Sequence, residues 1–229
     1  MLKELLSDFL NLIYPNVCTV CGCPLLKEEE AICSECIYKL PKTRFHLIQD
    51  NKAQKLFWGK VNVEFASSFF YFQKGTVSQK VLHHLKYRGG KEIGKQLGKQ
   101  FGAELKKVEQ LKDIDYIVPV PLHKNKFKKR GYNQSEMIAN GLSEILNTPV
   151  ETSNLLRVIE NPTQTKKGTY ERWENTSGVF ALSDQHLFKN KHILLVDDVL
   201  TTGATVEACI NALCNTKDVK VSFVSLAIA

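Results

Sequence analysis

The hydrophobic pattern begins with a helical stripe at the N-terminus. Its apolar positions lie three or four residues apart, as on one face of an amphipathic helix: Leu2, Leu5, Leu6, Phe9, Leu10 and Ile13. Glu4 and Asp8 interrupt the stripe, and no small-residue cleavage site follows it, so the segment does not fit a signal peptide. A helix that packs on its own protein is favoured over one that lies on a membrane surface.

Further along the chain the pattern alternates between strand and helix. Strands are predicted at 64–72, 115–120, 192–196 and 219–228, and helices at 77–86, 92–108, 135–146 and 204–213. The run HILLV at 192–196 is continuously apolar, as expected of a parallel strand that is buried on both faces. The polar stretch 161–178 is predicted to be a loop. This alternation predicts an α/β fold, a mostly parallel sheet flanked by helices.

Composition narrows the class of protein. Of the 229 residues, 43% are hydrophobic and 24% are charged, which is typical of a globular protein and excludes wholesale disorder. No apolar run reaches the length of a membrane span, so a cytoplasmic protein with reduced thiols is expected. The formal net charge of +7 favours anionic partners such as phosphates, nucleotides or nucleic acid, although it also fits a merely soluble surface.

Five of the seven cysteines lie near the N-terminus. Cys18-x-x-Cys21 and Cys33-x-x-Cys36 each present two thiols to one metal ion, and four thiolates close the tetrahedral shell of a structural zinc. Disulfides fit a reducing compartment poorly, and paired turns of this kind favour zinc over an iron–sulfur cluster. Cys23 is a spare thiol that could replace Cys21 as a ligand.

These features divide the chain into two predicted units. Residues 1–44 combine the amphipathic helix with the four-cysteine zinc-binding module, and residues 45–229 form the α/β domain. Cys209 and Cys214 lie in the second unit, on or just beyond the helix predicted at 204–213, where buried packing thiols are expected.

The segment 193–205, ILLVDDVLTTGAT, carries the strongest chemical signal. Asp197 and Asp198 follow the buried strand, at the sheet edge where α/β proteins bind ligands, and adjacent carboxylates suit the two hydroxyls of a vicinal diol. The next turn opens a helix whose amides suit a phosphate, with Gly203 allowing close approach. An ordinary capped strand-to-helix turn would explain the threonines but not the two acids. A nucleoside-triphosphate loop is excluded because its first glycine and its lysine are missing.

VDDVLTTGAT resembles the signature of type I phosphoribosyltransferases, which bind phosphoribosyl pyrophosphate (PRPP). The resemblance implies that Asp197 and Asp198 are the catalytic-site acids that hold the ribose 2- and 3-hydroxyls. It also implies a loop for the 5-phosphate, formed by Thr201, Thr202, Gly203, Ala204 and Thr205. Magnesium that accompanies the pyrophosphate is implied in the same way.

Other motifs are similar to those of the ComF family of competence-associated phosphoribosyltransferase-like proteins. They are the cysteine pairs, LKYRGG at 85–90, VPVPLHKNKFKKRGYNQSE at 118–136, and a polar stretch with Gln164, Arg172 and Asn175. The resemblance implies a PRPP-binding protein linked to DNA uptake or to nucleotide metabolism. It leaves open whether the chain is an active phosphoribosyltransferase, a non-catalytic PRPP or nucleotide sensor, or a partner of a DNA-uptake helicase that handles single-stranded DNA.

The basic segments add candidate anion ligands. Lys86 and Arg130 match the motifs of the resembled family and are the cations expected at the PRPP site. The run 124–130 is most simply a solvated loop. With Phe127 and Tyr132 nearby, it is also a candidate to bind single-stranded DNA by phosphate contacts and aromatic stacking.

Overall fold

A computed structural model describes residues 15–87, 90–158 and 178–229. The amphipathic stripe predicted at the N-terminus lies outside these residues. So do Gln164, Arg172 and Asn175, and most of the loop predicted at 161–178. Within the described ranges, no helix has the length and apolar character needed to cross a membrane.

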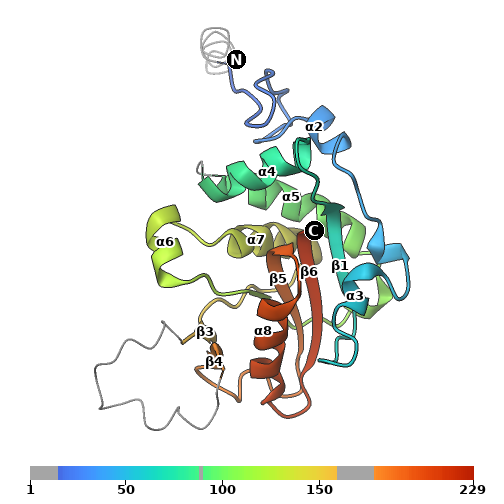
Figure 1. The fold of residues 1–229 in the computed structure, drawn as a ribbon, viewed down its shortest axis with the longest axis vertical. Helices are drawn as coiled ribbons and strands as arrows, with labels where there is room; N and C mark the ends of the chain where they lie inside the picture. Colours follow the sequence, from blue (N-terminus) through green and yellow to red (C-terminus); the bar gives the residue numbers. More distant parts are fainter. Residues whose placement is uncertain (1–14, 88–89, 159–177) are drawn as a thin grey trace.

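A four-stranded parallel sheet forms the centre of the molecule (Figure 1). Its strands, in spatial order, are β1 (Ala66–Tyr71), β6 (Lys220–Ile228), β5 (His192–Leu200) and β2 (Tyr116–Pro119). The central strands β5 and β6 are almost wholly buried, as continuous apolar runs require. A separate antiparallel pair joins β3 (Leu155–Arg157) to β4 (Phe180–Leu182). The predicted α/β class with a mostly parallel sheet is confirmed.

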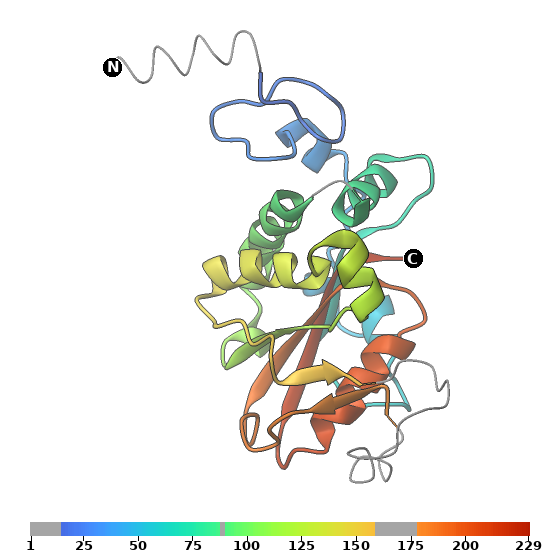
Figure 2. The same ribbon diagram turned by 90° about the vertical axis from the view of Figure 1, so that its left-hand side faces the viewer.

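Helices cover both faces of the sheet, as the two views in Figures 1 and 2 show. The α-helices are α2 (Ser34–Tyr38), α3 (Lys52–Lys55), α4 (Val77–Tyr87), α5 (Lys91–Leu105), α6 (Lys124–Arg130), α7 (Gln134–Leu146) and α8 (Ala204–Cys214). Short 3-10 turns, η1 (Phe45–Leu47) and η2 (Glu109–Leu111), lie in the connections. One apolar core joins the sheet to α4, α5 and α7, and a second joins it to α8 and the β3–β4 pair.

Strand β5 extends beyond its predicted end. The sequence places the acids after the strand, whereas β5 continues through Asp197 and Asp198 to Leu200. The strand keeps its partner on one side, because β6 pairs with it as far as Ile228. On the other side β2 stops at Pro119, so the acids lie where the sheet has lost one neighbour.

The basic run 124–130 is a helix, α6, and not the solvated loop that is the simplest prediction from sequence. Lysine is a good helix former. The run also has a capping residue before its first turn and a glycine after its last. His123 Nδ1 accepts a hydrogen bond from the Asn125 amide at 3.2 Å, and Gly131 ends the helix in the left-handed conformation with φ 77°. No side chain of α6 is buried, so its cations face solvent.

The cysteine-containing segment is attached to α5 through one side chain. Gln96 Oε1 accepts hydrogen bonds from the amides of Ala31 at 3.1 Å and Ile32 at 2.8 Å, and Gln96 Nε2 donates to the Ile32 carbonyl at 2.9 Å. Lys99 adds an ion pair with Glu30 at 2.9 Å. The segment also contributes side chains to the apolar core that contains α4 and α5. Packing therefore crosses the boundary predicted at residue 44.

Helices α5 and α7 cross at backbone contact distance. A Cβ on Gly98 would lie 2.3 Å from the Ile138 carbonyl oxygen, and one on Gly141 would lie 2.1 Å from that of Lys95. Only glycine fits at such a contact. The crossing fixes α7 against the sheet, and the first turn of α7 in turn reaches the acids of β5.

Candidate functional site

The two acids of β5 differ in their surroundings. Asp197 Oδ1 accepts a hydrogen bond from Ser135 Oγ at 3.0 Å and another from the Asp198 amide at 2.8 Å. The Asp198 carboxylate instead forms an ion pair with Lys86 Nζ of α4 at 3.3 Å. Three elements, α4, β5 and α7, thus meet at the acid pair.

Burial and, after it, the neighbouring Asp198 carboxylate raise the pKa of Asp197 to about 7. The hydrogen bonds from the Asp198 amide and from Ser135 oppose this rise. Asp197 therefore titrates near neutral pH, whereas an ordinary aspartic acid is fully ionised there. A strongly perturbed carboxyl next to a second charge is typical of a functional site.

The turn after β5 is open to solvent. Thr201, Thr202, Ala204 and Thr205 are exposed, and only Gly203 is buried among them. Gly203 has a left-handed φ of 83°, which favours glycine, and a Cβ there would also press on the Phe57 ring at 3.3 Å. Helix α8 starts at Ala204, and its first amides have no acceptors within the helix. The turn has the open amides and hydroxyls that an anion needs.

The residues between α6 and α7 tie the candidate site to α4 and to the end of β2. Tyr132 Oη donates a hydrogen bond to the Leu85 carbonyl of α4. Asn133 Nδ2 donates to the Val120 carbonyl beyond β2 at 3.0 Å, and Asn133 Oδ1 caps α7 by accepting from the Ser135 amide at 3.2 Å. These bonds hold Ser135 in place beside Asp197. The motif 118–136 contains Ser135 and Asn133, but the sequence alone assigns neither a role, because Asp197, the partner of Ser135, lies 62 positions away.

Arg130 lies beside α7 and has no ion pair with the acids of β5 among the described residues. Its Nη1 donates to Gln134 Oε1 at 2.6 Å, and its guanidinium stacks 5.6 Å from the centre of the Tyr87 ring. The Nε2 of Gln134 is buried and has no hydrogen-bond partner within the described residues. A buried donor without an acceptor is costly, so this amide is held in an unfavourable environment beside Arg130.

The prediction that Tyr132 serves as a stacking partner is wrong. Its side chain is only 4% exposed, so no base can stack on it. Tyr87 and Phe127 are instead 57% and 48% exposed, close to the cations of α4 and α6. The packing of Tyr132 under α4 cannot be read from its position beside a basic run.

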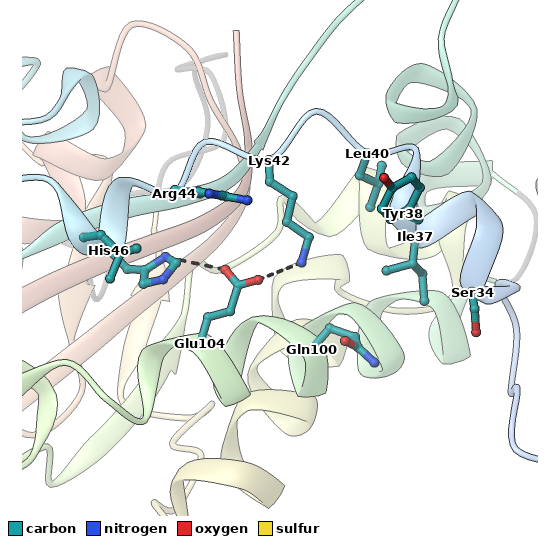
Figure 3. Close-up of a pocket in the computed structure, with 10 residues that line it drawn as sticks. Ser34, Ile37, Tyr38, Leu40, Lys42, Arg44, His46, Gln100 and Glu104 are labelled. Atoms are coloured by element: carbon teal, nitrogen blue, oxygen red, sulfur yellow. Dashed lines mark hydrogen bonds and ion pairs between the residues drawn. The ribbon is translucent and has the colours of Figure 1, made fainter.

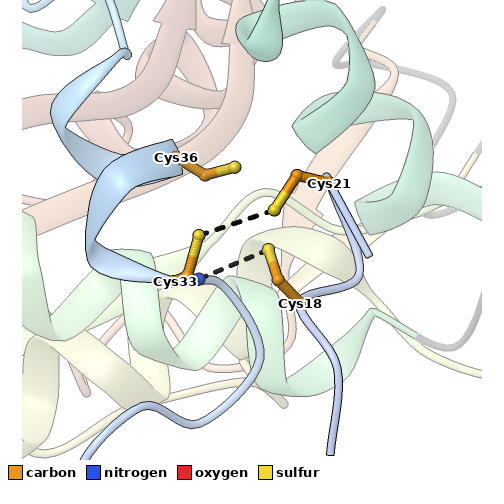
Figure 4. Close-up of side chains that lie close together, drawn as sticks. All are labelled: Cys18, Cys21, Cys33 and Cys36. Atoms are coloured by element: carbon orange, nitrogen blue, oxygen red, sulfur yellow. Dashed lines mark hydrogen bonds between the residues drawn. The ribbon is translucent and has the colours of Figure 1, made fainter. Parts of the chain in front are cut away.

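The four paired cysteines come together in space (Figure 4). The sulfurs of Cys18, Cys21, Cys33 and Cys36 all lie within 4.8 Å of one another and could hold a metal ion. Cys21 and Cys33 approach to 3.6 Å, and Cys18 Sγ accepts a hydrogen bond from the Cys33 amide at 3.3 Å. Four thiols at this spacing fit tetrahedral zinc, the commonest metal for such a ligand set. Cys23 is not one of the four.

A model of the phosphoribosyl transferase domain matches residues 133–227, which include the acids, the open turn and Ser135. Competence protein F of Haemophilus influenzae is 35% identical over 104 residues, 45% of each chain. The DNA utilization protein YhgH of Escherichia coli K12 is 27% identical over 85% of this chain and 89% of its own length. Competence protein ComFC of Bacillus subtilis is 26% identical over 86% and 71%, respectively. The chain is thus similar to competence and DNA utilization proteins, and residues 133–227 match the phosphoribosyl transferase domain.

The alignment with the Haemophilus protein spans about half of that relative's length. Among solved structures, the chain resembles a glutamine PRPP amidotransferase from Bacillus subtilis, with a TM-score of 0.42, 18% identity, and 61% and 30% of the two chains covered. An adenine phosphoribosyltransferase aligns with a TM-score of 0.39 at 15% identity, covering 66% and 75%.

Proposed function

We propose that this protein is a member of the ComF family and binds PRPP at the end of β5. Asp197 and Asp198 would accept hydrogen bonds from the ribose 2- and 3-hydroxyls, and the turn 201–205 would hold the 5-phosphate. The observation that carries the proposal is the adjacency of two partly buried carboxylates to an exposed turn that opens α8. Acceptors for a diol and donors for a phosphate are the two halves of a ribose 5-phosphate site.

The pyrophosphate needs cations, which α4 and α6 offer. Lys86 pairs with Asp198, so a bound pyrophosphate would compete with that carboxylate for the lysine. Arg130 is the last residue of α6, and its Nη1 donates to Gln134 Oε1 at the start of α7. Carboxylates and phosphate oxygens are ligands that magnesium prefers, and the ion would neutralise charge on the leaving group. Asp197 and Asp198 are the protein residues that fit such an ion.

If the chain turns over, the 5-phosphoribosyl group would move to a nitrogen nucleophile and pyrophosphate would leave. Positive charge develops at the anomeric carbon, and the nearby carboxylates would stabilise it while the turn fixes the sugar in place. The residues that hold PRPP do not identify an acceptor. A non-catalytic PRPP or nucleotide sensor therefore uses the same site.

Two measurements separate these cases. Calorimetric titration with ribose 5-phosphate should show binding, because the acids and the turn are proposed to contact that half of PRPP. If neither ribose 5-phosphate nor magnesium PRPP binds, the proposal is contradicted. Pyrophosphate release during incubation with PRPP and a panel of nucleobases then identifies an enzyme. Binding without release identifies a sensor.

The cysteine cluster is proposed to hold a structural zinc. Four thiolates leave no open position for water, so the ion would fold the segment rather than catalyse a reaction. We retain residues 1–44 as the zinc-binding module and 45–229 as the phosphoribosyltransferase-like domain. Gln96 would join the two.

The names of the relatives support a proposed role in competence and DNA utilisation. We further propose, from the family resemblance of the motifs, that the protein works in the cytoplasm beside a DNA-uptake helicase. A second candidate activity, binding of single-stranded DNA, has its own support. Helix α6 exposes four lysines, and the exposed rings of Tyr87 and Phe127 offer stacking platforms. Oligonucleotide affinity should fall steeply as salt rises. Equal affinity for wild type and Phe127→Ala at every salt concentration would exclude stacking there.

A further inference from the structure

A groove separates the cysteine segment from the body of the protein, on a surface that the proposed PRPP site does not use (Figure 3). Its volume is about 810 Å³. One wall is formed by α2 and the residues after it, and the other by α5, with the connection to η1 at one end. This seam groove is lined by Ser34, Ile37, Tyr38, Leu40, Lys42, Arg44, His46, Leu47, Gln100 and Glu104.

The groove holds more positive than negative charge. Glu104 is the one carboxylate among its lining residues; Oε1 pairs with Lys42 at 2.7 Å and Oε2 faces His46 at 3.5 Å (Figure 3). Burial lowers the pKa of His46, which leaves this ring mostly neutral at neutral pH. Lys42 alone therefore balances Glu104, and the charge of Arg44 is left over.

Arg44 is the feature that calls for a partner. Its side chain is exposed, and its guanidinium has no ion pair or hydrogen bond among the described residues. Its backbone is left-handed, with φ 55°, a conformation that is rare for a residue with a long side chain. The backbone is thus in an unfavourable conformation at Arg44. This is also the cation of the groove whose charge no described residue neutralises.

Apolar surface lies beside this charge. Tyr38 is 88% exposed and Leu47 is 73% exposed, and both line the groove. Single exposed apolar residues are ordinary, but here a tyrosine, a leucine and an unpaired arginine line one hollow. Tyrosine and arginine are enriched at the centres of protein interfaces.

These properties favour a peptide over a nucleic acid. A phosphate chain would bring several negative charges close to the Glu104 carboxylate, which lies between Lys42 and His46. Repulsion between these charges would oppose binding. A carboxylate on Arg44 would meet a single unpaired cation, and apolar side chains could cover Tyr38 and Leu47.

We propose that the seam groove docks an acidic segment of a partner protein, with a carboxylate on Arg44 and apolar side chains on Tyr38 and Leu47. This surface is independent of the phosphoribosyl site. Both walls depend on how the cysteine segment sits on α5, so docking depends on that packing. A contact of this size is weak and transient, as suits a regulatory encounter.

The test is selection of phage-displayed random dodecapeptides on the full-length, zinc-loaded protein. Enriched sequences should combine aspartate or glutamate with leucine or an aromatic residue. Fluorescence anisotropy with the synthesised peptides should then show about tenfold weaker binding to Arg44→Glu. Tyr38→Ala, at a position that is 88% exposed, should weaken binding without affecting the fold.

Lys217→Glu provides the matched control, because it reverses one exposed charge in the turn before β6. It should leave peptide affinity unchanged. The proposal is overturned if selection enriches nothing, if the enriched peptides lack acids, or if Arg44→Glu binds them as tightly as wild type. If an oligonucleotide displaces a bound peptide, the groove binds nucleic acid instead. If the protein dimerises with rising concentration and Arg44→Glu abolishes the dimer, the groove binds a second copy. Either result would also overturn the proposal.

Discussion

Ser135 Oγ, at the first turn of α7, donates a hydrogen bond of 3.0 Å to Asp197 Oδ1 in the middle of the candidate site. The bond stabilises the ionised form of a carboxyl whose burial favours the neutral one. Helix α7 thereby sets both the position of Asp197 and the pH at which it becomes charged.

Replacing Ser135 with alanine should move that pH upward. Loss of the donor raises the pKa of Asp197 further above its ordinary range, so the ionised acceptor is scarcer at neutral pH. We expect about tenfold weaker PRPP binding at pH 7, and a pH midpoint of binding that moves to higher values. Calorimetry across pH 6 to 9 measures both. A variant with weaker binding but an unmoved midpoint would show a merely structural role for Ser135.

Replacing Asp197 with asparagine should stabilise the protein more at high pH than at low pH. The folded-state pKa of about 7 lies above the ordinary value of 3.8, so the folded protein holds a proton that the unfolded chain has already lost between these limits. Stability of the wild type therefore falls as pH rises from 4 to 7. Asparagine has no such proton to lose. Relative to wild type, the variant should gain roughly 4 kcal/mol more at pH 8 than at pH 4.

Urea unfolding at the two pH values checks this expectation. An equal difference between variant and wild type at both values would mean that Asp197 titrates in its ordinary range.

Gln96 should be critical for the attachment of the cysteine segment. Gln96→Leu keeps the approximate volume but leaves the amides of Ala31 and Ile32 and the Ile32 carbonyl without their partner. We expect a loss of about 3 kcal/mol in the free energy of unfolding and faster hydrogen exchange in residues 15–40. Gln100→Leu, one turn further along α5 at an exposed position, is the control and should have little effect. Comparable losses in the two variants would contradict the role of Gln96.

The identity of the metal ligands can be settled with two serine substitutions. Cys21→Ser removes a thiol from the cluster and should abolish stoichiometric zinc, whereas Cys23→Ser should retain it. Elemental analysis of the purified variants gives the answer. Loss of zinc from Cys23→Ser but not from Cys21→Ser would make Cys23 the ligand in place of Cys21. Absence of zinc from the wild type would contradict the zinc site.

Much of the fold could be predicted because its signals are local. The run HILLV is buried on both faces in β5, and the apolar spacing of 77–86 and 135–146 matches α4 and α7 within two residues. The extension of β5 through the acids could not be predicted, because it depends on a partner strand that lies much later in the chain. The residues that cap the two ends of α6, His123 and Gly131, are present in the sequence. A run of lysines is nevertheless more often a solvated loop.

The candidate site divides in the same way. Asp197, Asp198 and the turn after them form one contiguous motif, so sequence alone identifies them. Ser135 lies 62 positions from Asp197, and no local pattern marks it as a partner. Gln96 looks like any polar residue of an amphipathic helix until the cysteine segment is folded against it.

The central claim is that the acids of β5 hold the ribose of PRPP, and its most direct test is calorimetric titration of magnesium PRPP into wild type and Asp197→Asn/Asp198→Asn. The substitutions preserve shape, remove both negative charges and replace one acceptor oxygen of each carboxylate with an NH2 donor. We predict saturable binding to the wild type and at least about hundredfold weaker binding to the variant, with an intact circular dichroism spectrum. Equal affinity of the two proteins for PRPP would contradict the account.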